Sequence, residues 1–161
     1  MIRTRAAAAA DADDVARLTG QLGYRVEPGL VATRLQRILA RPDQILLVAD
    51  DDGSVVGWIH GTRVEYLEAD PFVVVAGLVV DRARRGQGIG RLLLAEVESW
   101  GRKEGCSIVR LWSSAARTAA HRFYQRAGYE NIKTQYSFAK SVDPSGGTGF
   151  EAFVPDIPAG G

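Results

Sequence analysis

The feature that most constrains the fold is an uncharged segment, residues 72–80, followed at once by a glycine-rich loop and an amphipathic helix. Nine residues without a charge are typical of a strand that is covered on both faces at the centre of a sheet. The helix after the loop carries large apolar side chains on one face, namely Leu93, Leu94, Val97 and Trp100. A strand, a loop and a helix in this order predict a layered structure in which helices pack on a sheet.

The segments around this unit complete the prediction of an α/β (α+β) fold. Apolar runs bounded by turn residues predict strands at residues 2–6, 45–49, 54–63 and 108–113, and one or two short strands at 129–141. Helices are expected after Asp11, after Pro28 and over residues 118–127. We therefore expect a mixed, mostly antiparallel central sheet of six to seven strands with helices on both faces.

Composition is that of one independently folding domain. The chain has 161 residues, of which 46% are hydrophobic and 24% charged, as in ordinary globular proteins. We assign residues 1–141 to this single domain. Residues 142–161 hold five glycines, three prolines and no base, so we expect a Gly/Pro-rich tail there.

Charge, cysteine content and hydropathy exclude several classes of protein. The 20 basic and 19 acidic residues leave a formal charge of +1, so no basic field points to a nucleic-acid partner. A single cysteine, Cys106, excludes an intramolecular disulfide framework and a multi-cysteine zinc site, and we expect no metal. Because neither a secretory signal nor a run of about 18 apolar residues is present, we expect a soluble, cytoplasmic protein without a membrane partner.

The glycine-rich loop has the features of an anion-binding site. Gly86, Gly88 and Gly90 alternate where the strand passes into the helix, so main-chain N–H groups can converge on a phosphate at the positive end of the helix dipole. Arginines, which bind phosphate oxygens in a bidentate manner, cluster around it at positions 82, 84, 85 and 91. A diphosphate fits this arrangement; the structural alternative is a turn with solvated arginines.

Two common phosphate-binding motifs do not match this loop. A Walker loop requires Gly-Lys-Ser/Thr, and no lysine is near. A dinucleotide fingerprint requires a third glycine three residues after the second, where this sequence has Arg91 or Leu93. Both mismatches disfavour an ATP or GTP site and a dinucleotide-dependent oxidoreductase.

Two separated motifs resemble those of the Gcn5-related N-acetyltransferase (GNAT) family. The family loop, Arg/Gln-x-x-Gly-x-Gly/Ala, reads here Arg85-Gly86-Gln87-Gly88-Ile89-Gly90. Residues 120–129, with Tyr124 and the pair Gly128-Tyr129, resemble the family's tyrosine helix and its Gly-Phe/Tyr signature. The resemblance covers residues 1 to about 141 in element order, and it implies the acyl-CoA N-acyltransferase fold with acetyl-CoA as cosubstrate.

The resemblance also implies where acetyl-CoA binds. The cosubstrate would lie in a splay between the strand that ends at Val80 and the strand that ends near Ser113. Its diphosphate would rest on the loop and its pantetheine arm along the first of these strands. The implied cofactor-binding residues are Leu78, Val79, Val80, Arg85, Gly86, Gln87, Gly88, Ile89, Gly90, Arg91, Ser113, Arg117, His121 and Tyr124.

Tyr124 is the first candidate for a catalytic residue. By the resemblance it donates a proton or a hydrogen bond to the departing CoA sulfur, a role that suits a phenol. The structural alternative is a tyrosine packed beside Phe123. Arg117, His121 and Tyr124 recur at helical spacing and so share one face, where all three can border the cofactor.

The sequence does not single out one residue as the general base. An amine with a lysine-like pKa is protonated at neutral pH and must lose its proton before it attacks. Many family members carry a glutamate in the central strand, whereas this chain has Val73, Val74, Val75 and Ala76. Glu65, His60 and a water chain ending at Ser113 remain as candidates, of which we take Glu65 first.

The predicted function is transfer of an acetyl group from acetyl-CoA to a primary amine of a small molecule or peptide, by direct attack in a ternary complex. The alternative is a non-catalytic acyl-CoA-binding sensor, which would keep the loop and need no base. Aminoglycoside, polyamine, amino-acid and peptide acceptors all remain open. A homodimer is possible because edge strands can pair between subunits.

Overall fold

The computed structural model describes residues 1–146, and the chain divides into two compact units. Unit 1, Met1–Trp112, contains the strands and the helices α1 to α3, and unit 2, Ser113–Gly161, contains α4. That residues 1–141 form one domain stays a prediction. Most of the predicted tail, residues 142–161, lies outside the described residues.

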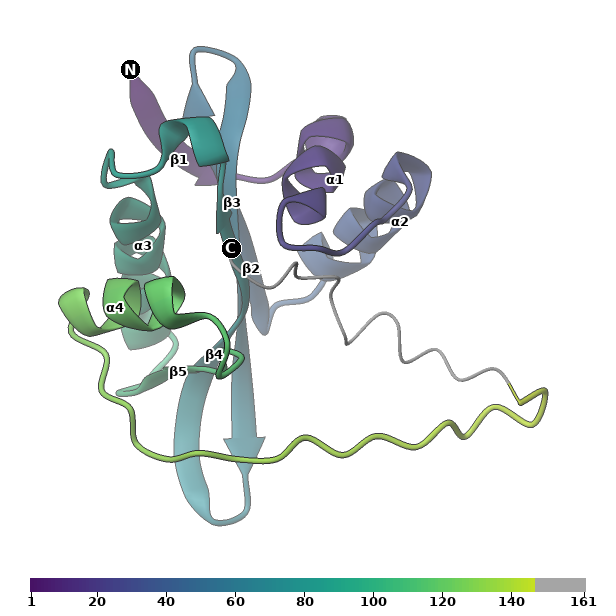
Figure 1. The fold of residues 1–161 in the computed structure, drawn as a ribbon, viewed down its shortest axis with the longest axis vertical. Helices are drawn as coiled ribbons and strands as arrows, with labels where there is room; N and C mark the ends of the chain where they lie inside the picture. The colour runs from purple at the N-terminus through teal and green to yellow at the C-terminus, as the bar shows by residue number, and fades with distance from the viewer. Residues whose placement is uncertain (147–161) are drawn as a thin grey trace. The chain divides into compact units, whose positions relative to one another are not determined.

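Unit 1 is built on a mixed sheet with the strand order β1-β2-β3-β4-β5 (Figure 1). Strands β4 and β5 are parallel and the other neighbours are antiparallel, which confirms the expected mixed, mostly antiparallel sheet. The described residues form five strands rather than six to seven. Their bounds are β1 Ile2–Ala6, β2 Gln44–Asp51, β3 Ser54–Tyr66, β4 Ala69–Val80 and β5 Val109–Leu111.

The strands expected at residues 129–141 are absent, which accounts for the lower count. Tyr136 and Phe138 alternate with polar residues, as in a strand, yet they are 91% and 92% exposed. Alternation predicts which face a segment can bury, but a strand forms only where a neighbour pairs with its main chain. The prediction of strands in this segment is therefore wrong.

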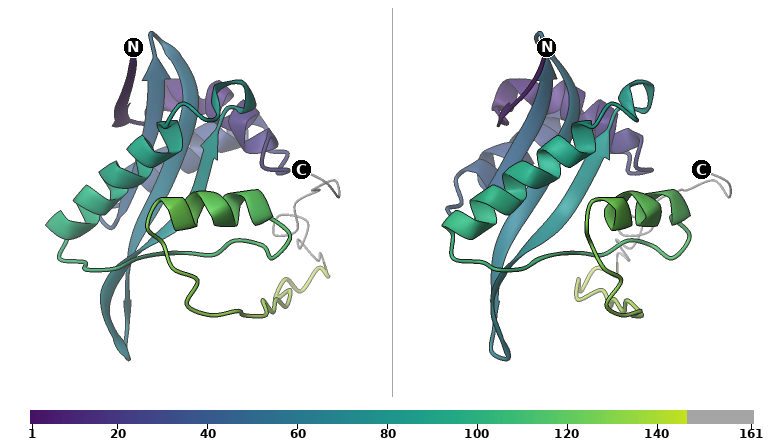
Figure 2. Two further views of the ribbon diagram at one scale, coloured as in Figure 1. Left: turned by 60° about the vertical axis from the view of Figure 1, so that its left-hand side comes forward. Right: turned by 90° about the vertical axis from the view of Figure 1, so that its left-hand side faces the viewer.

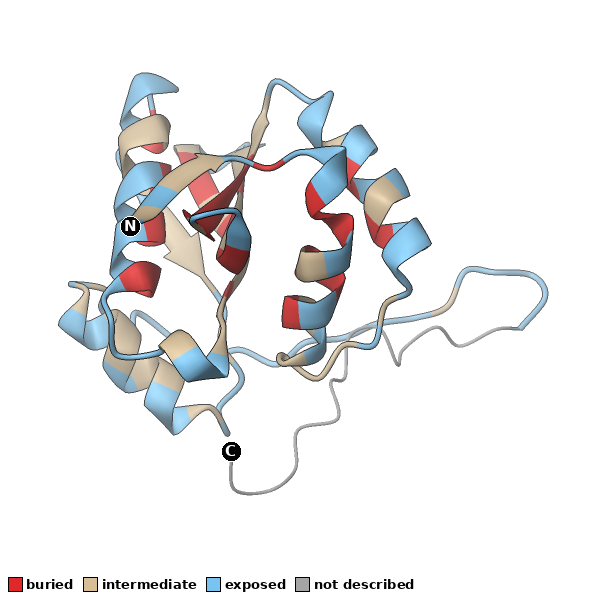
Figure 3. Ribbon diagram, turned by 90° about the horizontal axis from the view of Figure 1, so that it is seen from above, coloured by how far each residue is buried: buried red, intermediate tan, exposed pale blue. Residues whose placement is uncertain are grey.

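Helices cover both faces of the sheet, which confirms the expected layering (Figure 1). Helices α1 (Ala12–Gly20) and α2 (Pro28–Leu39) lie on one face, and α3 (Ile89–Lys103) lies along the other (Figure 2). Each is amphipathic, with its buried residues toward the sheet (Figure 3). No helix in the described part of the chain is long and apolar enough to cross a membrane.

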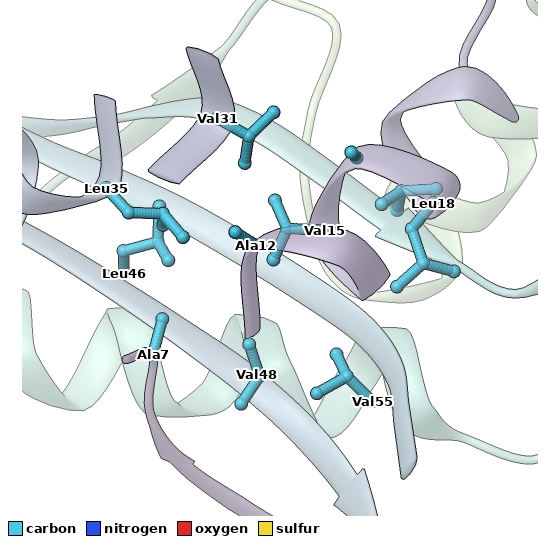
Figure 4. Close-up of a cluster of buried hydrophobic side chains, with 11 residues drawn as sticks. Ala7, Ala12, Val15, Leu18, Val31, Leu35, Leu46, Val48 and Val55 are labelled. Carbon is cyan, nitrogen blue, oxygen red and sulfur yellow. The ribbon is translucent and has the colours of Figure 1, made fainter. Parts of the chain in front are cut away.

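The core between the sheet and helices α1 and α2 is a cluster of small and branched apolar side chains (Figure 4). Val15 and Leu18 of α1 and Leu35 of α2 meet Leu46 and Val48 of β2 in this cluster. Close packing of such side chains holds the two helices at fixed positions on the sheet. Pro28 starts α2 at its first turn, as the sequence predicted.

A β-bulge in β4 reverses which face of the sheet its side chains occupy. His60 pairs with Gly77 and the next residue, Gly61, pairs with Val75, so Ala76 is an extra residue on β4. Before the bulge, Val73 packs against α3: a Cβ built on Gly101 of that helix would lie 2.8 Å from the Cγ2 atom of Val73. After the bulge, Val79 belongs to the cluster beneath α1 and α2.

The bulged strand is not at the centre of the sheet, contrary to the sequence-based expectation. The central strand is β3, and β4 is fourth in the order, between β3 and the short β5. The uncharged run at 72–80 arises because both faces of this strand are covered: the consecutive residues Phe72 and Val73 point to opposite faces and both are buried. Ala76 itself is exposed.

An ion-pair network fixes β1 against β2 and the start of α1. Arg5 donates from Nη1 and Nη2 to Asp11 at 2.8 Å and from Nε to Asp50 at 2.7 Å, and both carboxylates are buried. The Asp11 carboxylate also accepts a hydrogen bond from the Ala8 N–H group. The Arg5 guanidinium holds the pKa of each carboxyl below its usual value.

Replacing Asp11 with Asn should lower the free energy of unfolding at pH 7 by about 1–3 kcal/mol, because charged hydrogen bonds are lost. A lowered pKa contributes stability above the unfolded value of about 3.9, and that contribution disappears as the pH falls through the folded pKa. The difference between wild type and Asp11→Asn, measured by thermal unfolding, should therefore shrink as the pH falls below about 3.9. Asp13→Asn, at an exposed acid of α1, is the control. A difference independent of pH would contradict this account.

Candidate functional site

The first component of the site is an open edge on β4. Strand β5 pairs with β4 only from Val73 to Val75, and among the described residues no strand continues this edge from Ala76 to Val80. The Asp81 N–H group donates to Val56 O at 2.9 Å. By antiparallel alternation, the main chain of Val79 then faces β3. The N–H and C=O groups of Leu78 and Val80 face the open edge, where an extended ligand can pair with them.

The second component is the turn that leads from β4 into the loop, and it is anchored to α1. Asp81 accepts a hydrogen bond from the Ala83 N–H group at 3.1 Å and forms an ion pair with Arg17 at 2.7 Å. Gln21 accepts a hydrogen bond from the Arg82 N–H group at 2.9 Å. The Arg17 guanidinium lowers the pKa of Asp81, so the carboxylate stays charged and the turn stays fixed.

The glycine loop is exposed at residues 85–88, and its backbone conformation requires glycine at two positions. Gly86 and Gly88 have φ angles of +77° and +81°, a region that other residues rarely adopt. Gly88 is the N-cap residue of α3, and its carbonyl already accepts the Leu92 N–H group at 3.0 Å. The N–H groups of Ile89 and Gly90 have no partner within the helix, so they and the helix dipole favour a bound anion.

The arginines around the loop divide into two groups. Arg82, Arg85 and Arg91 are exposed, and Arg85 donates from Nε to Val80 O at 3.4 Å. Arg84 is half-buried and forms an ion pair with Asp51, so its charge stabilises the turn. Three of the four arginines that the sequence places around the loop are thus exposed at its surface.

In unit 2, Tyr124 lies on α4 (Thr118–Arg126) and is held by the way that helix ends. The Tyr129 N–H group donates to Tyr124 O at 2.9 Å and the Gly128 N–H group donates to Gln125 O at 3.0 Å. These two bonds form a Schellman motif, in which Gly128 takes the required positive φ of +94°. The Tyr124 ring packs edge-on against the rings of Phe123 and Tyr129, at centroid distances of 5.1 and 5.9 Å.

The surroundings of Tyr124 keep its hydroxyl protonated. Burial raises its pKa above the ordinary value near 10, although the positive charge of Arg117 opposes the shift. A neutral phenol can donate a hydrogen bond or a proton to an anion. The chemistry of this side chain therefore suits a proton donor at neutral pH.

The other predicted residues of unit 2 lie just before or within α4. His121 shares a hydrogen bond between its Nε2 atom and Ser114 O at 2.9 Å, so this nitrogen is the donor. Its N–H group donates to Arg117 O at 3.1 Å. Ser113 Oγ is buried, and no partner for it is found among the described residues. The structure thus gathers Ser113, Arg117, His121 and Tyr124 in unit 2 and the loop and open edge in unit 1.

The two side-chain candidates for a general base lie on β3 in different surroundings. Glu65 is exposed, 3.4 Å from Arg63 Nη2, near the tip of the β3–β4 hairpin, which extends beyond α1, α2 and α3 (Figure 2). His60 is half-buried, pairs with Gly77 beside the bulge, and its Nε2 atom is 2.8 Å from Gln44 Oε1. Burial lowers the pKa of His60 below its usual value of 6.5, so its ring is neutral at pH 7.

Sequence reasoning missed the residues that act through tertiary contacts. The bulge at Ala76, the anchoring of Asp81 by Arg17 and the Gln44 partner of His60 carry no local motif. The pair Ala76-Gly77 is the one available signal, because a glycine inside a strand pattern indicates a bulge or close approach. A Cβ on Gly77 would lie 2.7 Å from the Trp58 ring.

Comparison with known proteins places this geometry in context. Residues 14–129 match the sequence model of the Acetyltransferase (GNAT) family. An aminoglycoside N(6')-acetyltransferase type 1 from Stenotrophomonas maltophilia is 30% identical over 105 residues, which cover 63% of this chain and 69% of that protein. An aminoalkylphosphonate N-acetyltransferase from Salmonella typhimurium is 35% identical over 92 residues, which cover 56% of this chain and 58% of that protein.

The fold is also similar to solved structures. The structure of an aminoglycoside N-acetyltransferase, AAC(6')-Iy in complex with CoA, matches with a TM-score of 0.79 and 21% sequence identity. The match covers 87% of this chain and 95% of that one. At this identity the likeness concerns the fold alone.

Replacing Gly128 with Ala should destabilise the protein by about 1 kcal/mol, because a Cβ disfavours the positive φ that ends α4. The control is Gly20→Ala at the last residue of α1, where nothing lies within 4 Å of an added Cβ and alanine favours the helix. Thermal unfolding should show a lower midpoint for Gly128→Ala and an unchanged or higher one for Gly20→Ala. Equal effects of the two changes would argue against the Schellman motif.

Proposed function

The chain belongs to the GNAT family of acetyltransferases and uses acetyl-CoA as its cosubstrate, and we propose that it acetylates a primary amine of a small polar molecule by direct attack in a ternary complex. The observation that carries this proposal is the continuity of two features in unit 1. The open edge at Leu78 and Val80 leads through one anchored turn into the glycine loop at 85–90.

The donor groups of this edge and loop fit the chemistry of CoA. The pantetheine arm contains amides, which can pair with the N–H and C=O groups of Leu78 and Val80 as an added strand would. The diphosphate carries negative charge, which the N-terminus of α3 and the exposed Arg85 and Arg91 favour. Gly86 and Gly88 carry no side chain that would block the approach of a phosphate to the loop.

The reaction needs groups that stabilise charge and move protons. Acetyl-CoA supplies an activated acyl group. An N–H group at the open edge near Leu78 would stabilise the negative charge that develops on the thioester oxygen when the amine attacks. Tyr124, assigned from the resemblance of residues 120–129 to the family signature, would donate its proton to the departing sulfur.

The names of the relatives indicate the class of acceptor. The two curated relatives described above are named for aminoglycosides and aminoalkylphosphonates. Both kinds of molecule present an amine on a polar scaffold, so we propose an acceptor of that type. A peptide amine is the second choice.

A non-catalytic acyl-CoA sensor is the competing function, favoured by the absence of a carboxylate from residues 73–76 of β4. Release of the CoA thiol on addition of small polar amines distinguishes the two functions. Thiol release that depends on the amine supports the enzyme. Tight binding of acetyl-CoA without thiol release from any amine supports the sensor.

Replacing Gly88 with Ala should weaken acetyl-CoA binding by about tenfold or more, because a strained loop misdirects donors whose hydrogen bonds to charged groups are each worth about 1.5–3 kcal/mol. The matched control is Gly105→Ala at the other end of α3, where φ is +76° and nothing lies near an added Cβ. Both variants should lose similar stability, but calorimetry should show weaker binding only for Gly88→Ala. Equal affinity of the two variants would contradict the assignment of the loop.

Replacing Tyr124 with Phe should lower kcat by roughly tenfold or more while leaving acetyl-CoA affinity close to that of wild type, because the ring remains and the proton is lost. Steady-state thiol release and calorimetry measure the two quantities. Phe123→Leu, which alters a neighbouring ring and keeps the hydroxyl, is the control. If Tyr124→Phe retains wild-type kcat, Tyr124 is not the proton donor.

A further inference from the structure

The strand β3 presents a polar, partly open face beside the bulge of β4. The even-numbered residues Trp58, His60 and Thr62 share this face, and Trp58 packs against the cluster beneath α1 and α2. The odd-numbered residues face α3, since a Cβ on Gly61 would lie 3.1 Å from Val97 of that helix. His60 and Thr62 are half-buried and Ala76 of β4 is exposed, so this part of the face is accessible.

The environment of His60 contains an orienting partner, and no charged group adjacent to it is found within residues 1–146. Its directly opposite neighbours are Leu46 on β2 and Gly77 on β4, neither of which is ionisable. Among the charged residues of α1, Arg17 forms ion pairs with Asp14 and Asp81, and Asp13 is exposed. The charged residues Arg34 and Arg37 of α2 are exposed. Burial is the cause of its lowered pKa, so the imidazole is neutral and able to accept a proton at pH 7.

Gln44 determines which ring nitrogen is available. The Gln44 Oε1 atom lies 2.8 Å from His60 Nε2, and an amide oxygen can only accept, so Nε2 carries the hydrogen. In the neutral ring Nδ1 is then the acceptor. The side chain is thus held in one tautomer, and Nδ1 has no hydrogen-bond partner in the part of the chain that the structure describes.

The bulge brings His60 next to the open edge. His60 pairs with Gly77, and the next residue of β4 is Leu78, whose main chain faces that edge. Directly opposite residues in an antiparallel pair have Cα atoms about 4.5–5.5 Å apart. Gly77 has no side chain, and the Trp58 ring occupies the space over it, so this ring forms an apolar wall between His60 and the edge at Gly77. The exposed Ala76, next to Gly77, leaves the bulge side of the face accessible.

We propose that His60 is the general base of the acetyl transfer, that it acts through Nδ1 directly or through one water molecule, and that Gln44 is its positioning residue. This inference rests on the proposed function and deepens it. The acceptor would then bind over the face formed by Trp58, His60, Thr62 and Ala76. The substrate class is the primary amine of the proposed function, whose N–H proton a neutral imidazole can accept.

The proton balance of the step is complete. The ammonium form of the acceptor first gives one proton to His60 Nδ1, which passes it to solvent. The neutral amine nitrogen then forms a bond to the acyl carbon and gives a second proton to His60 Nδ1, while the bond between that carbon and sulfur breaks. By the resemblance of residues 120–129 to the family signature, Tyr124 would give its proton to the sulfur. His60 then releases a proton to solvent and Tyr124 regains one, so both residues return to their starting states.

Glu65 is the natural comparison, because the sequence suggested it first. It lies five residues farther along β3, about 16 Å from His60 at the usual rise per residue. Its carboxylate is exposed and within 3.4 Å of Arg63. The two candidates are therefore separable by substitution.

The test is the pH dependence of kcat/KM for thiol release in wild type, His60→Gln and Glu65→Gln. Protonation of His60 at low pH removes the base, so the wild-type rate should fall as the pH drops through a pKa below 6.5. His60→Gln should lose this acidic limb and roughly a hundredfold in kcat, whereas Glu65→Gln should keep both. Calorimetry with acetyl-CoA and thermal unfolding should show that both variants bind and fold as wild type does.

A second measurement covers the case in which His60→Gln folds poorly. Imidazole added to His60→Ala should restore part of kcat, with a dependence on pH that follows the added imidazole. A merely structural histidine would show no such rescue. Wild-type rates and an unchanged acidic limb in His60→Gln would overturn the inference while leaving the acetyltransferase intact. Absence of thiol release from wild type with every amine would overturn the proposed function instead.

Discussion

The constraint on which the rest of the structure depends is the extra residue in β4. Successive side chains of a regular strand alternate between the two faces of the sheet. Without a bulge, Val73 and Val79, six residues apart, would therefore share a face. The bulge at Ala76 places Val73 against α3 and Val79 beneath α1 and α2. It also lies where β5 stops pairing, so the main chain beyond it keeps hydrogen-bonding groups for a ligand.

Main-chain groups dominate the candidate site. Leu78 and Val80 contribute N–H and C=O groups, and the loop contributes the first N–H groups of α3. Their directions are fixed by the Arg17–Asp81 ion pair, by Ile89 in the core and by the conformations of Gly86 and Gly88. Donors fixed in advance need no reorganisation when charge develops, which is the main source of electrostatic catalysis.

Much of the fold could be predicted from the sequence because local patterns determine it. Pro28 marks the start of α2, the turn at Asp52-Gly53 joins β2 and β3, and the glycines after Val80 mark the start of α3. The prediction of strands at residues 129–141 was wrong because alternation of polar and apolar residues does not reveal whether a partner strand is present. The expectation that residues 72–80 form the central strand was also wrong, because an uncharged run is typical of any strand that is covered on both faces.

The site could be predicted where chemistry is carried by a contiguous motif, as in the loop and in the Gly128-Tyr129 pair. It could not be predicted where partners are distant in the chain. The sequence alone does not distinguish Glu65 from His60 as a base. Only the pairing of β3 with β4 shows that Glu65 lies near the hairpin tip and His60 beside the bulge. Gln44, sixteen residues from His60, had no signal at all.

The central claim is that the main chain at 85–90 and at Leu78 and Val80 binds the cosubstrate. Amide NMR during titration with CoA tests it most directly, because it reports on each N–H group separately. The account predicts that the largest shifts occur at the amides of Gly86, Gly88, Gly90, Leu78 and Val80. Saturable binding of CoA that shifts other amides and leaves these five unchanged would contradict it.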